Sequence, residues 1–349
     1  MDRRRYLRAA AVAAMAAAAS GIARGPLAWG QPSVRLLWQA DAALKVFPVL
    51  LALRLGFFHA EGVAVAAGPW DARTQPPAPA PGAGTVRVLA GDFDTVLRQH
   101  ARGQAEQAFL ALARTPLLGL AERHIPDAVD APPLAWPNAR IGILASHALP
   151  PRIVALALQR QGLTARAGQL VALADTAQIE AALQDGRLDA VCIDDPLLTR
   201  LQRRGAIRVV IDTRQWSESQ RLVGGAMVGA CLSVATSQVA THGAELQATA
   251  RAVQRALRWL QTASPLDLAD HADLAGFAGD ATAFLAVFAQ MRESYSPDGA
   301  VGEPMVLNTL RVWQALPFGA GDDRLAPTRL YTPRFVATAD APGAPWARG

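Results

Sequence analysis

Two adjacent carboxylates end a short apolar segment near the middle of the chain, in residues 183–196 (LQDGRLDAVCIDDP). Asp194 and Asp195 stand directly before Pro196, where a strand that only enters a turn needs no more than Gly, Asn or Ser. Ligands of open α/β sheets bind outside the carboxyl ends of the strands, so acids there can contact a bound molecule. Asp195 has a structural alternative, since it can cap a helix that begins at Pro196. Asp194 has no such role, and for it we weigh a ligand contact against plain exposure to solvent.

The other candidate ligand contacts are chosen by the same criterion, because each stands just after a predicted strand. Together the candidates are Trp38, Asp41, Asp92, Phe93, Ser146, His147 and Asp194. Some have structural alternatives, because Asp92 and Ser146 can cap helices and Trp38 can belong to the core.

No motif in the sequence indicates catalysis, a resident cofactor or a metal site. Ser146 and His147 are sequence neighbours, which does not make a nucleophile–base pair, and no GxSxG motif surrounds the serine. The six histidines show no HExxH or similar ligand spacing. Cys192 and Cys231 lie in separate apolar segments without a CxxC pattern, so they form either a disulfide or two buried thiols.

Alternating strands and helices must position these residues. We expect strands at residues 34–38, 62–66, 85–89, 140–144, 170–173, 188–193, 206–211 and 230–235. Helices are expected at residues 46–57, 150–161 and 176–184, after residue 91, and over a long stretch after residue 235. The alternation predicts βαβ units and a largely parallel sheet. Proline-rich loops are expected at residues 74–84 and 127–137.

Composition limits the class of protein and of partner. The chain of 349 residues is 51% hydrophobic and 18% charged, which indicates a folded protein of one large or two modest domains. Its net charge of +5 is carried almost wholly by arginine, because Lys45 is the only lysine. The arginines are scattered and not interleaved with aromatic residues, which argues against nucleic acid as a partner.

The first 28 residues have the pattern of an export signal. Arginines at positions 3–5 precede a run of mostly alanine at positions 9–19, followed by small residues where a signal peptidase could cut. The paired arginines fit a twin-arginine signal, and an ordinary Sec signal is the alternative. No cysteine follows the run, so no lipid anchor is expected, and we expect the mature protein in the periplasm.

Four phrases of the sequence together carry a family resemblance. They are VRLLWQAD with GFFHAEG (residues 34–41 and 56–62), ARIGILASHALPPRIVALALQRQGL (139–163), LQDGRLDAVCIDDP (183–196) and YSPDG (295–299). In this order they resemble the solute-binding proteins of sulfonate-, taurine- and nitrate-type ABC transporters. The resemblance covers residues 34–316 and implies a type II periplasmic-binding-protein fold, α/β in class, with two lobes and a ligand cleft between them. It assigns residues 32–130 and 223–335 to lobe I, 138–222 to lobe II and 336–349 to a flexible tail. It also implies a monomer that binds a small solute and delivers it to the membrane subunits of an ABC permease.

The resemblance leaves an alternative function and a choice of ligand open. Fungal thiamine-pyrimidine synthases share the scaffold, but they carry a cysteine-rich iron motif, which Cys192 and Cys231 do not supply. Asp195-Pro196 also departs from the usual Glu-Pro. Acids at the strand ends favour a ligand with N–H donors, such as an aminopyrimidine stacked on Trp38 or Phe93, over a sulfonate. Lys45, His147 and Arg152 are the expected positive partners.

Overall fold

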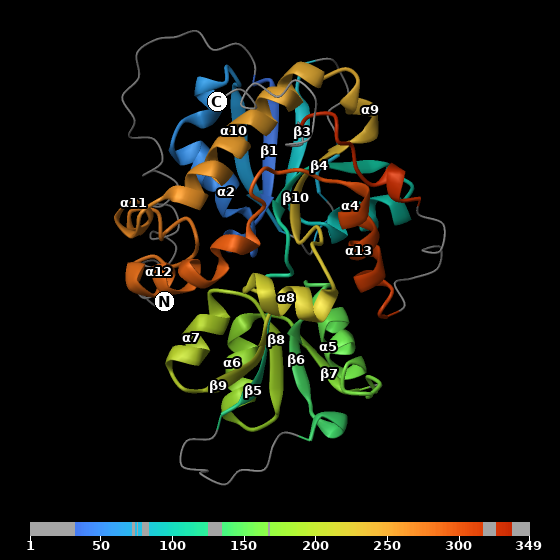
Figure 1. The fold of residues 1–349 in the computed structure, drawn as a ribbon, viewed down its shortest axis with the longest axis vertical. Coiled ribbons are helices and arrows are strands. Elements are labelled where there is room, and N and C mark those ends of the chain that lie inside the picture. The colour runs from blue at the N-terminus through green and yellow to red at the C-terminus, as the bar shows by residue number, and fades with distance from the viewer. Residues whose placement is uncertain are drawn as a thin grey trace, which may run out of the picture. The chain divides into compact units, whose positions relative to one another are not determined.

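Two sheets of five strands organise the chain (Figure 1). The computed structural model describes residues 32–71, 74, 76–78, 84–124, 135–166, 168–316 and 326–336. The predicted export signal lies outside these residues, as do parts of both proline-rich segments and the predicted tail apart from Val336.

The first sheet has the order β2-β1-β3-β10-β4. Its strands are β1 (Val34–Gln39), β2 (Val65–Trp70), β3 (Val86–Asp92), β4 (Glu106–Ala113) and β10 (Ala230–Ala235). β1 runs parallel to β2 and β3, whereas β10 is antiparallel to both β3 and β4. Every residue of β3 and β10 is buried, which explains their nearly continuous apolar sequences.

The second sheet has the order β7-β6-β8-β5-β9. Its strands are β5 (Gly119–Arg123), β6 (Ile141–Leu144), β7 (Leu170–Leu173), β8 (Ala190–Ile193) and β9 (Ile207–Asp212). β6 is parallel to β7 and β8, and β5 is antiparallel to β8 and β9. Both sheets are therefore mixed, since β10 and β5 each run opposite to the other four strands of their sheet. The predicted parallel pairing does not hold for β10, and β4 and β5 are not among the predicted strands.

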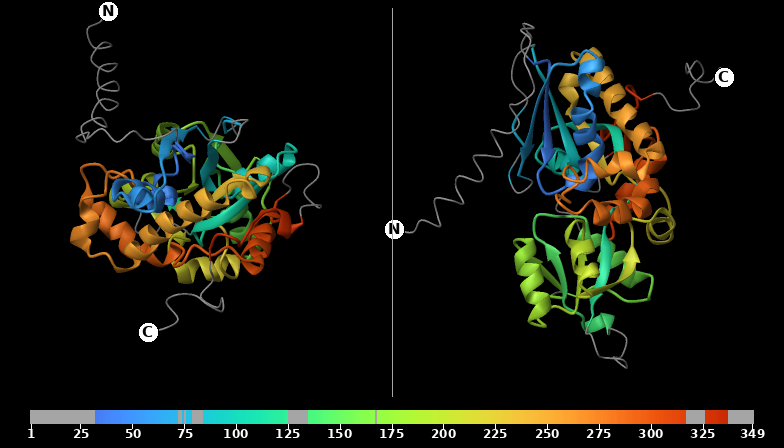
Figure 2. Two further views of the ribbon diagram at one scale, coloured as in Figure 1. Left: turned by 90° about the horizontal axis from the view of Figure 1, so that it is seen from above. Right: turned by 90° about the vertical axis from the view of Figure 1, so that its left-hand side faces the viewer.

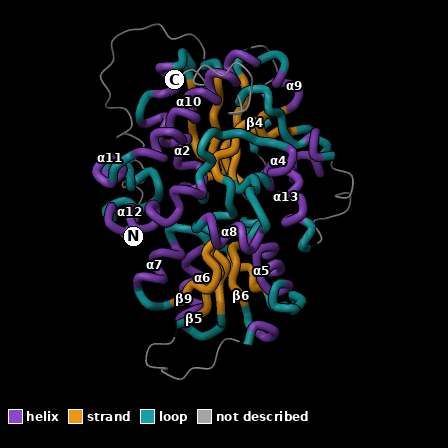
Figure 3. Tube along the Cα trace, viewed as in Figure 1, coloured by secondary structure: helices purple, strands orange, loops and turns teal. Residues whose placement is uncertain are grey.

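Helices flank both sheets (Figure 3). On the first sheet they include α2 (Ala43–Arg54), α3 (Phe57–Ala60), α4 (Asp94–Ala101), α9 (Thr236–Val239) and α10 (Gly243–Thr262), and on the second α5 (Pro150–Gln159), α6 (Thr176–Gln184), α7 (Leu197–Arg203) and α8 (Trp216–Val223). The later part of the chain adds α11 (Pro265–Ala269), α12 (Ala281–Met291) and α13 (Glu303–Trp313). In the part of the chain that the structure describes, no helix combines the length and the apolar character needed to cross a bilayer.

Local sequence explains the best-defined helices. α10 buries one apolar face that includes Leu246, Val253 and Leu257. The helix lies against α2 and α3, and Figure 2 shows the orange α10 beside the blue α2. α6 begins where the Asp175 side chain accepts a hydrogen bond from the Gln178 N–H at 2.8 Å. The predicted helix at residues 176–184 is confirmed, whereas the helix expected at 46–57 is divided at Gly56, which has a φ of 70°.

We call the first sheet with its helices lobe I and the second sheet with its helices lobe II. The chain passes from β4 to β5 and returns from β9 to β10, and the two crossing segments are joined by hydrogen bonds. The Thr213 N–H donates to the Leu118 carbonyl at 2.8 Å, and the Leu118 N–H donates to the Thr213 hydroxyl at 2.9 Å. The residue boundaries given above for the lobes stay a prediction.

One hydrophobic core contains residues of both lobes. Phe93, Val96 and Leu97 of lobe I belong to it together with Ile143 and Leu149 of lobe II. The hydrophobic core is thus continuous from one lobe to the other, and it includes residues of the crossing segments such as Leu118 and Val228.

Candidate functional site

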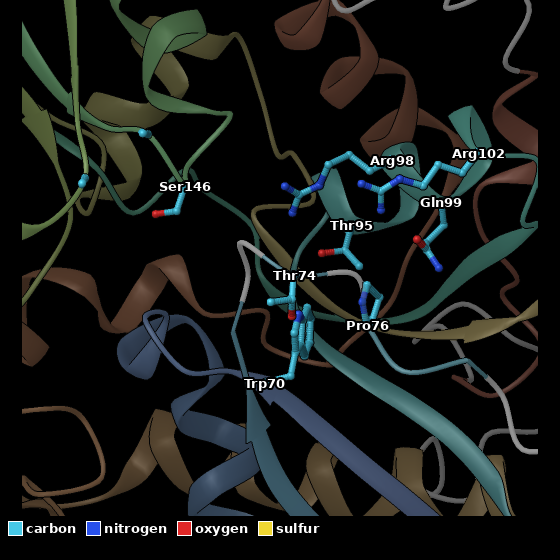
Figure 4. A pocket seen from close by; sticks show the side chains of 10 residues that line it. Trp70, Thr74, Pro76, Thr95, Arg98, Gln99, Arg102 and Ser146 are labelled. Carbon is cyan, nitrogen blue, oxygen red and sulfur yellow. The ribbon is translucent and has the colours of Figure 1, made fainter.

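A cavity of about 330 Å³ lies between the two lobes (Figure 4). Lobe I contributes the end of β2, the segment that follows it and one side of α4, and lobe II contributes the ends of β6 and β7. The lining residues are Trp70, Thr74, Pro76, Thr95, Arg98, Gln99, Arg102, Ala145, Ser146 and Ala174. Its volume is at the small end of the range for sites that hold small molecules.

One face of α4 supplies the positive charge of this cavity. Thr95, Arg98, Gln99 and Arg102 are three or four residues apart, so they lie on the same side of the helix and its end. The Arg98 guanidinium lies 3.0 Å from the Asp94 carboxylate, whereas within the described residues Arg102 has no ion pair and is exposed. The cavity therefore offers one paired and one unpaired guanidinium to a ligand.

Two buried donors at the cavity have no hydrogen-bond partner among the described residues. Trp70 Nε1 and Thr95 Oγ1 are both buried, and the two side chains are 7% and 4% exposed. A buried N–H or O–H without a partner is costly, and such groups are normally satisfied by protein, water or ligand. Donors of this kind beside two arginines favour a ligand that accepts hydrogen bonds.

A cluster of ion pairs occupies the neighbouring part of the space between the lobes. Lys45, in the first turn of α2, places Nζ 3.0 Å from an Asp92 carboxylate oxygen and 3.3 Å from the Asp194 carboxylate. Asp92 ends β3 in lobe I and Asp194 follows β8 in lobe II, so one ammonium joins the two lobes. Burial lowers the pKa of Lys45, but Asp92 and Asp194 outweigh it and hold the pKa above its ordinary value.

His147 adds a second link between the lobes, in which the basic group comes from lobe II and the acid from lobe I. Its Nε2 lies 3.1 Å from the Asp41 carboxylate of lobe I, and its Nδ1 lies 3.7 Å from Asp194. Burial lowers the pKa of His147, while the charge of Asp194 and the hydrogen bond with Asp41 raise it, and the net pKa is raised. Partial burial raises the pKa of Asp41, but the hydrogen bond with His147 and the charges of His147 and Lys45 outweigh it, and the net pKa is lowered.

Contacts within the first sheet hold Asp92 in position. The Asp92 N–H donates to the Gln39 side-chain oxygen at 2.6 Å. This contact requires glycine at position 91, since a Cβ there would lie 2.2 Å from the same oxygen. The neighbouring carboxyl of Asp94 is fully enclosed, and burial raises its pKa to about 6 in spite of the adjacent Arg98.

The other acid of the Asp194-Asp195 pair belongs to a separate cluster within lobe II. Asp195 accepts a hydrogen bond from the Thr199 N–H at 3.0 Å and pairs with Arg214 at 2.9 Å. Arg214 also pairs with Asp212 at 2.7 Å. The helix begins after Pro196, one residue later than predicted, yet Asp195 still satisfies a backbone N–H of its first turn.

The structure places the seven candidate residues in three settings. Ser146 lines the cavity, and Asp41, Asp92, His147 and Asp194 gather in the ion cluster. Phe93 is buried in the shared core and Trp38 packs partly buried against the first core. The alternative of an exposed Asp194 is wrong, because this residue is only 9% exposed and is paired. Ligand contacts of the seven residues stay predictions.

Sequence reasoning missed the residues that give the cavity its charge. Arg98 and Arg102 lie on a helix and not at a strand end, so a search limited to strand ends passes over them. Their i, i+4 spacing in DTVLRQHAR was the available signal. Arg152, in contrast, lies over the Trp313 ring and donates to main-chain carbonyls, away from the cavity lining.

The remaining reactive side chains are accounted for by burial. Cys192 and Cys231 are free thiols, both buried, and burial raises the pKa of each. Within the described ranges no group of three or more His, Cys, Asp or Glu side chains is placed to hold a metal ion. Lys45 is held as a paired ammonium, which opposes its use as the free amine of a Schiff base.

Comparisons with known proteins relate the fold to binding proteins of transporters. No protein-family model matches the sequence, and no curated protein does. Among solved structures, a protein from Bordetella bronchiseptica RB50 is 23% identical, with a TM-score of 0.69 over 87% of this chain and 95% of that one. The periplasmic aliphatic sulphonate binding protein SsuA from Escherichia coli is 13% identical, with a TM-score of 0.60 over 88% and 93%. The periplasmic nitrate-binding protein NrtA from Synechocystis PCC 6803 is 12% identical, with a TM-score of 0.62 over 87% of each chain.

These likenesses establish the fold. The chain has the type II periplasmic-binding-protein fold, with two α/β lobes, as the resemblance implied, and that expectation is confirmed. Among the solved structures that it resembles, those of the sulphonate-binding and nitrate-binding proteins are of periplasmic binding proteins.

Proposed function

We propose that this protein is the solute-binding component of an ABC importer and that it captures a small organic anion between its lobes. The observation that carries the proposal is the cavity that both lobes line, with Arg98 and Arg102 on one side and Ser146 on the other. Closing two lobes around a solute is the usual way in which this architecture binds.

The chemistry of the cavity favours an anion over the heterocycle with N–H donors that the strand-end acids suggested. Asp41, Asp92 and Asp194 are already paired with Lys45 and His147, so these carboxylates are not free acceptors. The cavity itself presents two guanidiniums, and the Trp70 N–H and Thr95 hydroxyl, which lack partners among the described residues, are buried in its wall. Guanidinium groups suit carboxylates, sulfonates and phosphonates, because their paired N–H groups match two oxygens.

A thermal-shift screen tests the class of solute. The purified protein is heated with ethanesulfonate, taurine, nitrate or 4-aminopyrimidine, each in excess. We expect an organic anion to raise the melting temperature, since a ligand that binds only the folded state stabilises it. Stabilisation by 4-aminopyrimidine alone would contradict the proposal and would support a heterocycle as the ligand.

The cellular part of the proposal concerns export and delivery. We infer that residues 1–28 direct the protein to the periplasm by the twin-arginine route and that the mature monomer docks on an ABC permease. Replacing Arg3 and Arg4 by lysine keeps the charge but removes the arginine pair. Precursor should then accumulate in the cytoplasm, whereas normal periplasmic accumulation of this variant would indicate the Sec route.

A further inference from the structure

The only lysine of the chain lies buried between the two lobes. All other basic side chains of the sequence, apart from histidine, are arginines, and Lys45 is 3% exposed. It also stands in the first turn of α2, where the helix dipole disfavours a cation. Such a charge is stable only if acids compensate it, and here the acids come from both lobes.

The geometry of the cluster depends on the closed arrangement of the lobes. Separating them would leave Lys45 with Asp92 of its own lobe and remove its 3.3 Å contact with Asp194. The same movement would remove the 3.1 Å contact between His147 and Asp41. The cluster therefore contributes to closure from two directions, one cation from each lobe against an acid of the other.

The ammonium is suited to this position by its shape. It is a compact charge with three donors, so it can face carboxylates on two sides, whereas a guanidinium is planar and larger. Lys45 also lies beside the cavity and not in it. The ion pairs are next to α2, whereas the cavity is lined by residues of α4 and by residues at or after the ends of β2, β6 and β7. Phe93 and Leu149 belong to the hydrophobic core that both lobes share, so apolar burial accompanies the ion pairs.

We propose that Lys45 is an internal counterion that holds the two lobes closed without solute, so that the cavity is already formed when a solute arrives. This inference rests on the proposed function, since closure around a solute gives the contact its role. Lys45 is then a positioning residue, because it sets the distance between the α4 arginines and Ser146 without lining the cavity. Exchange of solute requires the lobes to part and the two contacts between them to break.

The single lysine permits a direct test on the solute-free protein. An acylating reagent such as N-hydroxysuccinimide acetate modifies amines, and trypsin then releases residues 36–54 (LLWQADAALKVFPVLLALR) for mass spectrometry. Labelling of Lys45 is compared in the native protein and in urea at the same pH. We expect strong protection in the native protein, and equal rates in the two states would overturn the inference.

Variants separate closure of the lobes from burial within one lobe. Asp194→Asn removes the acid of lobe II and keeps Asp92, and we expect labelling to accelerate roughly ten- to hundredfold, as for loss of a charge-assisted hydrogen bond. The matched control is Arg203→Met, which breaks the exposed contact between Arg203 of α7 and Asp280 at the start of α12. This control should label at the rate of the unaltered protein.

Small-angle scattering shows whether the lobes themselves move. The radius of gyration of solute-free Asp194→Asn should exceed that of the unaltered protein and of Arg203→Met. Faster labelling with an unchanged radius would mean that Lys45 reaches solvent without opening of the lobes, which overturns the inference, as would labelling that Asp194→Asn does not accelerate.

The outcome is separable from that of the proposed function, because no solute is present in these experiments. Protection of Lys45 in a protein that binds no organic anion contradicts the proposed function alone. Binding of an organic anion by a protein whose Lys45 labels freely contradicts this inference alone.

Discussion

Asp194 and Asp195 are adjacent in sequence and buried to a similar extent, yet they belong to clusters with different mechanical roles. Asp194 faces Lys45 and His147 and so joins lobe II to lobe I. Asp195 faces Arg214 within lobe II, where it also satisfies the first turn of α7. The first cluster depends on how the lobes are arranged, and the second is formed whenever lobe II is folded.

The comparison shows why burial alone does not assign a role to a charged residue. A buried ion pair inside one lobe affects the free energy of unfolding when it is broken. A buried ion pair between two lobes can be released by opening, after which water solvates both charges again. Mutations in the cluster within lobe II should therefore lower the free energy of unfolding, whereas mutations in the cluster between the lobes should change how far the lobes are open.

Loss of the cation within lobe II should have the largest effect. Arg214→Met leaves Asp195 and Asp212 without their partner in a buried place. We expect the free energy of unfolding to fall by about 3–5 kcal/mol, as for other broken buried pairs. Urea denaturation measures this, with Arg208→Met as the control, because Arg208 pairs with Glu122 at the exposed side of β9. Equal stability of the two variants would contradict the structural role of Arg214.

Replacing each of the two acids by asparagine should have effects of intermediate size, and it tests the comparison directly. Asp195→Asn should lower the free energy of unfolding by about 1.5–3 kcal/mol through its contact with Arg214, and it should leave the lobes closed. Asp194→Asn should change that free energy less and should instead increase the radius of gyration. Urea denaturation and scattering on both variants decide this, and the reverse pattern would show that the assignments are exchanged.

The pH dependence of closure should follow His147. Burial and the nearby charge of Lys45 lower its pKa, but Asp194, Asp41 and Asp92 outweigh them and hold it above the ordinary 6.5 when the lobes are closed. The contribution of the charged ring to closure is then fully present below pH 6.5 and is lost as the pH rises through the raised pKa. Scattering of the solute-free protein should show the lobes opening as the pH rises through that raised pKa. His147→Gln should remove this pH dependence, and an unchanged profile in the variant would exclude His147 as its source.

The smallest effect is expected from the exposed ion pair between α7 and the start of α12. Arg203 and Asp280 are about half exposed, so water and salt screen their attraction. Arg203→Met should change the free energy of unfolding by less than about 1 kcal/mol, which is the usual range for exposed pairs. A larger loss in urea denaturation would show that exposure does not separate this pair from the buried clusters.

Much of the fold could be predicted because several strands are short, apolar and bounded by turns. The segments that became β1, β3, β8 and β10 were recognised in this way. β4 was missed because its sequence, EQAFLALA, consists mostly of good helix formers. Its strand conformation is decided by pairing with β10, which lies far along the chain, and local sequence does not reveal that contact.

The sequence brought several candidate residues together but predicted neither their pairing nor the lining of the cavity. Asp41, Asp92, His147 and Asp194 were chosen by their position after a strand, and they lie in one region because the carboxyl ends of strands from both lobes meet there. Sequence could not show that Lys45 neutralises two of these acids, because that pairing requires the lobes to be packed together. The acids therefore suggested a ligand with donors, whereas the cavity beside them presents donors of its own.

The most direct measurement of the central claim is a calorimetric titration of the organic anion that stabilises the protein best, into the unaltered protein and into Arg102→Met. Arg102 is the cleaner choice of the two cavity arginines, because Arg98→Met would also leave Asp94 unpaired. We expect Arg102→Met to weaken binding roughly ten- to hundredfold, the effect of one charge-assisted hydrogen bond, and Arg160→Met, an exposed arginine outside the cavity lining, to bind normally. Binding of the anion by Arg102→Met with unaltered affinity would contradict the account, because the solute would then lie elsewhere than against α4.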